Sequence, residues 1–162
     1  MPEITPIGWL HTAVAIVSIL AGAWTLAVHK VIVPENRTGL IYLVGTLITA
    51  VTALMIYQRG TFGPGHALAV LTLVALAAGF LVTKIPAFSK IAKYFQALCF
   101  TATLLFHMIP AITDGLLRLP VGDPFLTDIR DPLLPKFYLA FFITFVIGYT
   151  FQFRWLRAQQ QA

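Results

Sequence analysis

The sequence predicts an all-α integral membrane protein, a helical bundle with five transmembrane helices. Of its 162 residues, 59% are hydrophobic and 10% are charged, whereas a soluble domain is about 45–50% apolar and about 25% charged. Apolar runs of about 20 residues recur, the length that a helix needs to cross about 30 Å of hydrocarbon. The runs lack the alternation of barrel strands, so helices are expected.

The five runs cover residues 7–28, 38–57, 64–83, 94–113 and 134–153. The first is too long for a cleavable signal peptide and follows Glu3 rather than a basic stretch, so we expect it to stay in the mature protein. A Gly63-Pro64-Gly65 turn before the third run predicts an antiparallel hairpin that brings Tyr57 near His66. The whole chain, residues 1–162, is expected to be one transmembrane domain without internal repeats, unlike many secondary transporters.

The longest connection, residues 118–136, carries four prolines and three aspartates. Proline interrupts helices, so this segment is expected to be an irregular loop rather than a sixth helix. It is a candidate cap or partner surface.

Basic residues divide unequally between the two sides that five crossings define. Seven lie on the side of the C-terminus: Lys30, Arg37, Lys84, Lys90, Lys93, Arg154 and Arg157. Four lie opposite: Arg59, Arg118, Arg130 and Lys136. The positive-inside rule therefore predicts that the N-terminus lies outside and the C-terminus in the cytoplasm.

The net charge of +5 is explained by cations at helix ends, where they anchor against lipid headgroups. The expected partner is therefore the lipid bilayer and not a nucleic acid, and the sequence leaves open a membrane-protein partner or a homo-oligomer. Cys99 is the only cysteine and falls inside the fourth run, so no intrachain disulfide is possible and a small core residue is expected.

Three runs carry a stripe of small or polar residues on one face, because residues at steps of three and four share a face of an α-helix. The stripes consist of His11, Ala15, Ser18, Gly22, Thr25 and His29; of Tyr42, Gly45, Thr49 and Thr52; and of Gln96, Cys99, Thr103, His107, Pro110 and Asp114. Small residues let helices approach closely and hydroxyls bond across them. These stripes are therefore predicted to face the bundle interior.

Three histidines fall at a similar predicted depth, in the outer third of their helices: His11, His66 and His107. Ionisable groups at membrane depth are costly and commonly mark a functional site or a buried polar network. We therefore expect these three side chains to line one outer site, with Tyr57 and Asp114 as groups that orient them. His29 lies about 27 Å from His11 along the same helix and is not part of it.

Three kinds of site fit this pattern. Three neutral imidazoles are a ligand set for zinc or copper, and two imidazoles on facing helices are a ligand set for a b-type haem. In the third, the histidines bond to hydroxyls and Asp114 pairs with Arg118 one turn away. No tight ligand spacing such as HExxH or CxxC selects among them, so the cofactor is left undetermined.

Enzyme motifs are absent: the sequence has no Walker loop, dinucleotide fingerprint or G-x-S-x-G elbow. An intramembrane metal hydrolase would need a group that activates a nucleophile beside the histidines, and none is evident. Whether the protein is an enzyme is therefore left open.

Two segments, NRTGLIY (residues 36–42) and TFGPGHALAVLTL (residues 61–73), resemble a family of predicted bacterial integral membrane proteins that is known only as a domain of unknown function. Arg37, Gly39 and Tyr42 match the first segment. The second is matched by Phe62, Gly63, Pro64, His66 and Ala67. The histidine that precedes the arginine in the family is absent here. The resemblance covers the first half of the chain and implies no known activity.

The sequence thus predicts a multi-pass inner-membrane protein with two alternative functions. One is a redox or metal-handling role, based on an outer histidine site that binds haem or a transition metal. The other is a cofactor-free accessory or interaction protein.

Overall fold

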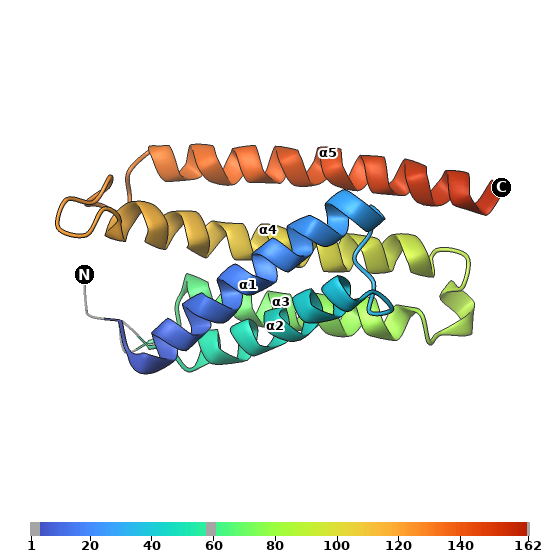
Figure 1. Ribbon diagram of the computed structural model, residues 1–162, viewed down its shortest axis with the longest axis horizontal. Helices are drawn as coiled ribbons and strands as arrows, with labels where there is room; N and C mark the ends of the chain where they lie inside the picture. Colours follow the sequence, from blue (N-terminus) through green and yellow to red (C-terminus); the bar gives the residue numbers. More distant parts are fainter. Residues whose placement is uncertain (1–3, 58–60, 162) are drawn as a thin grey trace.

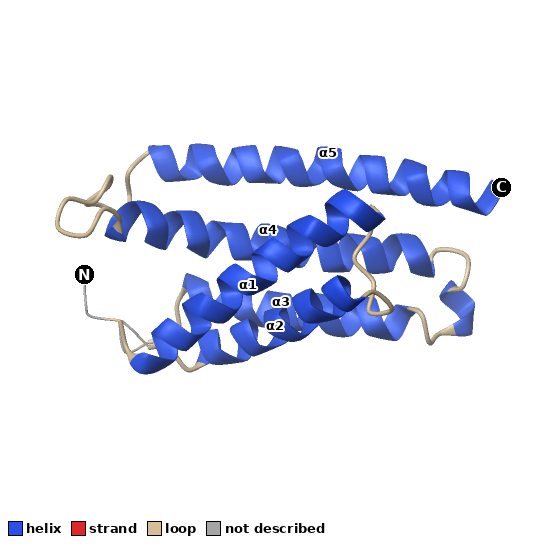
Figure 2. Cartoon of the chain, viewed as in Figure 1, coloured by secondary structure: helices blue, strands red, loops and turns tan. Residues whose placement is uncertain are grey.

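The computed structural model describes residues 4–57 and 61–161, and it confirms the predicted fold class. Five α-helices follow one another: α1 (Pro6–His29), α2 (Arg37–Leu54), α3 (Pro64–Val82), α4 (Ala92–Arg118) and α5 (Leu133–Gln161), with a short 3-10 helix, η1 (Pro86–Phe88), before α4. All five α-helices are long and apolar enough to cross a membrane. Figure 2 shows only helices and loops in the described part of the chain.

The helices form an up-and-down bundle with two distinct ends (Figure 1). We call the end where α1 begins the N-side; α2 and α4 end there, and α3 and α5 begin there. The opposite end, where α5 ends, is the C-side. Helices adjacent in sequence pack against each other, and α1 crosses the bundle obliquely and also touches α4. This order places the early part of α1 and the late part of α4 in the same half of the molecule.

Local signals set the ends of α1. The Thr5 hydroxyl accepts a hydrogen bond from the backbone N–H of Gly8 at 3.2 Å, and Pro6 occupies the first turn, where its missing N–H costs nothing. Lys30 ends the helix with a left-handed φ of 68°, and its backbone N–H donates to the Leu26 carbonyl. The C-side end of α1 is therefore closed by a lysine whose backbone is fixed.

Glycines allow the first four helices to approach closely. A Cβ atom added at Gly22 would collide with the ring of Tyr42, one at Gly45 with the side chain of Ser18, and one at Gly79 with the ring of Phe100. Without hydrophobic driving force between helices in lipid, such close packing supplies much of their association energy. The pairs α1/α2 and α3/α4 are therefore sterically fitted interfaces.

The apolar core lies between these helices. Its buried members are Ile32, Tyr42, Leu43, Leu76, Cys99 and Phe100. Cys99 is a buried free thiol in this cluster, which confirms the expectation of a small core residue. The predicted stripes of α1 and α4 also face inward, since Ser18, Gly22, Thr25, Thr103 and His107 are buried.

Helix α5 packs mainly against α4 and is otherwise exposed. Only Leu134 and Gln152 are buried on it. Polar side chains connect it to α4 along its length, through the pairs Thr113–Tyr138, Thr101–Gln152 and Tyr94–Gln160 and from the Tyr149 hydroxyl to the Tyr94 carbonyl. α5 is thus joined to α4 by several side-chain hydrogen bonds in addition to helix packing.

Several helix ends differ from the predicted ones. α2 ends at Leu54 rather than at residue 57, α4 continues to Arg118 rather than stopping at 113, and α5 continues to Gln161 rather than 153. Hydropathy reports only the apolar part of a helix, so it misses turns that continue beyond the apolar run. The loop accordingly covers 119–132 rather than 118–136, and α4 remains helical on both sides of Pro110.

Candidate functional site

The three histidines of the predicted site lie in the N-side half of the bundle, on α1, α3 and α4. His11 is near the beginning of α1 and His66 is in the first turn of α3. His107 is deeper than predicted, about 16 Å from the end of α4 at about 1.5 Å per residue. The cause is the extension of α4 past residue 113. The three imidazoles therefore do not share one depth.

His11 bridges α1 to α2. Its Nδ1 lies 3.1 Å from the Thr49 carbonyl oxygen and 3.1 Å from the Thr52 hydroxyl oxygen. A carbonyl oxygen only accepts, so Nδ1 carries the proton. The Thr52 hydroxyl donates to the Ile48 carbonyl at 2.8 Å, which leaves its oxygen free to accept. The Nε2 of His11 therefore has a lone pair, and it makes no hydrogen bond to any residue that the structure describes.

His107 joins α4 to the same face of α2. Its Nε2 lies 3.0 Å from the Thr46 hydroxyl, and its ring meets the ring of Tyr42 edge-on, with centroids 6.2 Å apart. The Thr103 hydroxyl donates to the Phe100 carbonyl at 2.7 Å, so the Tyr42 hydroxyl, 2.6 Å away, donates to Thr103. We call Tyr42, Thr46, Thr103 and His107 the buried quartet. All four side chains are buried.

His66 caps its own helix. Its Nδ1 accepts a hydrogen bond from the backbone N–H of Gly63 at 3.1 Å, as a side chain at the third helical position can. The ring stacks on Phe62, with centroids 5.2 Å apart, and lies 4.5 Å from the ring of Tyr57. The predicted proximity of Tyr57 and His66 is confirmed. Because Nδ1 accepts, the proton is on Nε2, which is buried and has no hydrogen-bond partner among the described residues.

The three histidines have different contacts: His11 and His107 join helices, and His66 caps α3. Among the residues described, no three His, Cys, Asp or Glu side chains are close enough together to hold a metal ion. The predicted three-imidazole set of His11, His66 and His107 is therefore not assembled. The predicted ion pair between Asp114 and Arg118 is confirmed, with Oδ1 and Nε 3.7 Å apart.

Helix α2 supplies the hydrogen-bond partners of both His11 and His107. Tyr42, Thr46, Thr49 and Thr52 follow at steps of four and three residues and so lie on one face. The Thr49 and Thr52 hydroxyls donate to carbonyls one turn earlier, at 2.7 and 2.8 Å. A hydroxyl with its proton committed to the backbone is not an activated nucleophile. The arrangement therefore joins helices through hydrogen bonds, and the Nε2 of His11 receives no hydrogen bond from the described residues.

Two features of this site were missed from sequence. Thr46 was left out of the α2 stripe although it lies four residues after Tyr42 and three before Thr49, on the same face. The capping role of His66 was also missed. The signal was available, because the order Gly63-Pro64-Gly65-His66 places the histidine at the third helical position after a glycine.

The loop between α4 and α5 forms a second candidate surface. It is folded back on the end of α4, with the backbone N–H of Phe125 donating to the Leu119 carbonyl and that of Leu126 to the Leu116 carbonyl. Val121 is 91% exposed and Phe125 71% exposed at its surface. Three carboxylates lie in the same segment, those of Asp123, Asp128 and Asp131. This loop therefore combines two highly exposed apolar side chains with three carboxylates and one cation, Arg130.

Comparison of the chain with protein-family models, with curated proteins and with solved structures gave no match. The arguments for function therefore depend on the residues and on their geometry.

Proposed function

We propose that the protein is a cofactor-free accessory or interaction protein of a bacterial inner membrane, and that the loop of residues 119–132 is its partner surface. The observation that carries this proposal is the exposure of Val121 and Phe125 on a segment held by its own backbone hydrogen bonds. An ordered apolar surface surrounded by polar residues is typical of a protein interface.

The charge of this loop favours a protein over the lipid surface. Three aspartates would be repelled by anionic headgroups, whereas cationic segments are the ones that bind them. The histidines support the cofactor-free part of the proposal, because His11 and His107 each use a ring nitrogen to join two helices and His66 uses one to cap α3. The likeness to the family of predicted bacterial membrane proteins is compatible with this role but adds no activity to it.

Site-specific photo-crosslinking in growing cells tests the partner surface. A photoreactive side chain at position 121 or 125 should give one discrete adduct, and the same group at Val74, an exposed residue in the middle of α3, should give only lipid adducts. The adduct should disappear when Phe125 is replaced by serine and the photoreactive group is at 121. Equal adducts at 74 and 121 contradict the proposal.

The orientation is proposed from the seven-to-four distribution of Lys and Arg. Reporter fusions after Lys90 and after Ala162 should both read cytoplasmic, and a fusion in the loop at Arg130 should read external. An external signal at either of the first two positions contradicts the five-crossing arrangement.

A second candidate function is a haem or transition-metal site at His11. One observation favours it: Nδ1 of His11 donates to a backbone carbonyl and Nε2 is left with a free lone pair, the arrangement in which histidines bind metals. Protein purified without chelator and without a histidine tag should be analysed by absorption spectroscopy and elemental analysis. A Soret band, or about one equivalent of zinc or copper, that is lost in His11→Ala and retained in His29→Ala would establish this function instead of the first.

A further inference from the structure

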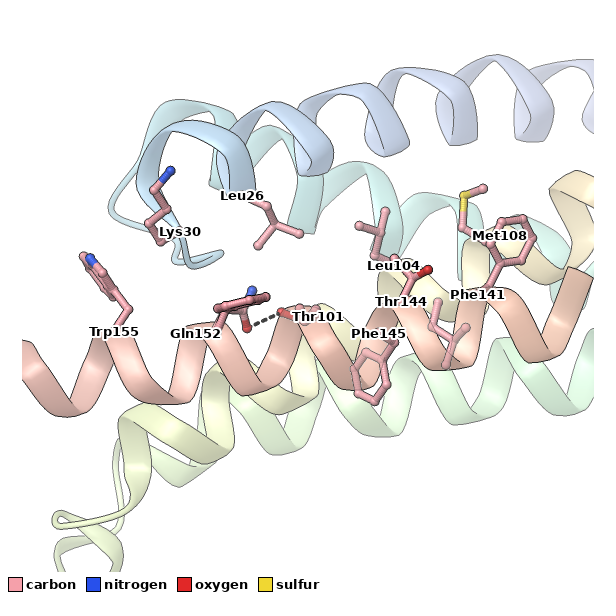
Figure 3. Close-up of a pocket in the computed structure, with 13 residues that line it drawn as sticks. Leu26, Lys30, Thr101, Leu104, Met108, Phe141, Thr144, Phe145, Gln152 and Trp155 are labelled. Atoms are coloured by element: carbon pink, nitrogen blue, oxygen red, sulfur yellow. Dashed lines mark hydrogen bonds between the residues drawn. The ribbon is translucent and has the colours of Figure 1, made fainter.

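The structure contains an apolar groove in the C-side half of the bundle, between α1, α4 and α5 (Figure 3). Its volume is about 550 Å³, within the range of about 300–1,000 Å³ that is usual for ligand sites. Gly148 of α5 lines the groove, and a Cβ atom added there would meet no atom within 4 Å.

The wall of the groove is suited to a hydrocarbon chain. Leu26 of α1, Leu104 and Met108 of α4, and Phe141 and Phe145 of α5 supply apolar atoms along it. The two threonines in the wall have their hydroxyl protons committed, Thr101 to the Gln152 side chain at 3.0 Å and Thr144 to the Ala140 carbonyl at 2.8 Å. A water molecule needs two to four polar partners, so an apolar occupant fits this wall better.

One end of the groove is polar and positively charged. Figure 3 shows Lys30 and Trp155 at this end, and Met108 and Phe141 at the other. The Lys30 ammonium has three N–H donors. One of them donates to the Ala27 carbonyl, so two are available to an anion. Trp155 is partly exposed, as an aromatic ring at the headgroup level is expected to be. Gln152, next inward, is buried, and its amide N–H groups bond to no described residue.

From this arrangement we infer that the groove binds one anionic phospholipid of the C-side leaflet. One acyl chain lies along the apolar wall, the phosphate binds the Lys30 ammonium, and the Gln152 amide donates to an ester carbonyl of the lipid. Charge complementarity at the mouth distinguishes this lipid from a zwitterionic one. The inference does not depend on the proposed partner surface, which lies at the other end of the molecule.

Tryptophan quenching by brominated lipids tests this inference in the full chain. Trp9 and Trp24, both 62% exposed, are replaced by phenylalanine so that Trp155 is the only reporter. In phosphatidylcholine vesicles, brominated phosphatidylglycerol should quench Trp155 with about fivefold higher apparent affinity than brominated phosphatidylcholine, as one lysine near a lipid phosphate provides. Equal quenching by the two lipids overturns the inference.

Two pairs of variants separate the parts of the site. Lys30→Gln should abolish the preference for the anionic lipid, while Lys84→Gln, another exposed C-side cation outside the groove, should keep it. Gly148→Leu should fill the groove and reduce quenching by both lipids, while Gly115→Leu, at an equally open position of α4, should not. Equal effects within either pair overturn the inference.

A second copy of the chain is the competing occupant. In a Cys99→Ser background, Gly148→Cys should remain monomeric under oxidising conditions if a lipid fills the groove. A disulfide-linked dimer together with weak quenching would assign the groove to a second copy and overturn the inference.

Discussion

The interfaces α1/α2 and α3/α4 differ in kind from the interface α4/α5. In the first two, Gly22, Gly45 and Gly79 allow a facing side chain to touch the backbone, whereas Gly148 of α5 faces open space. Hydrogen bonds cross all three interfaces, and in the first two they are combined with close contacts at glycines. The comparison shows that a glycine in a membrane helix marks a close contact only where a side chain of the neighbouring helix lies opposite it.

A matched pair of glycine substitutions, at Gly79 and Gly148, is the strongest test of this difference between the interfaces. Gly79→Leu forces the rigid Phe100 ring to move and should destabilise the protein by about 1–3 kcal/mol, the usual cost of overpacking. Gly148→Leu should change stability by less than about 0.5 kcal/mol. Reversible unfolding in mixed micelles, followed by circular dichroism, measures both. Similar losses in the two variants would show that α5 is packed as tightly as the other helices.

The buried quartet tests how much hydrogen bonding adds to the interface between α2 and α4. Tyr42→Phe removes the hydroxyl that donates to Thr103 and should cost about 0.6 kcal/mol, the average for such bonds between membrane helices, and at most about 1.7 kcal/mol. A double-mutant cycle with Thr103→Val isolates the coupling from the effect on packing. Tyr57→Phe, at an exposed ring, is the control. Absence of coupling would mean that Tyr42 contributes only its shape.

The attachment of α5 is expected to be weaker and local. Gln152→Leu removes the acceptor of the Thr101 hydroxyl and should accelerate amide exchange about threefold in α5, equivalent to about 0.6 kcal/mol, with α1 to α3 unchanged. Hydrogen exchange followed by mass spectrometry measures this helix by helix. Gln159→Leu, at an exposed position of the same helix, should have no effect. Acceleration in all helices would contradict a separately attached α5.

The smallest effect is expected at the N-side surface. The pair Asp114–Arg118 is partly exposed, with 59% of the Asp114 side chain accessible, so Asp114→Asn should cost less than about 0.5 kcal/mol. The difference from wild type should vanish in concentrated salt, because screening removes the interaction of exposed charges. A larger loss that persists in salt would indicate that Asp114 has a structural role beyond this pair.

The five helices could be predicted from sequence because membrane thickness dictates the length of apolar runs. Which face of α1 and α4 turns inward also followed from the spacing of small and polar residues. The extension of α4 and α5 did not follow, since turns such as Arg157–Gln161 are not apolar and a hydropathy pattern stops before them. That extension moved His107 to a depth different from the predicted one.

The candidate site was less predictable than the fold. The contact between His107 and Thr46 depends on how α4 is rotated and shifted relative to α2. The residue pattern of a single helix carries no information on either quantity. The separation of His66 from the other histidines follows from its cap on Gly63, a local feature that could have been recognised. Spacing along the chain therefore indicated which side chains face inward but not which ones meet.

The side-chain bonds between α4 and α5 also have a consequence for biogenesis. α5 is synthesised after α4, so α4 is complete before the α5 partners of its hydroxyls exist. Exposing the Thr113 hydroxyl to lipid before α5 arrives costs little free energy, because this hydroxyl also donates to the Ile109 carbonyl at 2.7 Å. The Gln152 amide has no such bond within its own helix and reaches Thr101 only when α5 is beside α4. A nascent α5 therefore enters the lipid most easily along the surface of α4, so that the first four helices act as the template for insertion of the fifth.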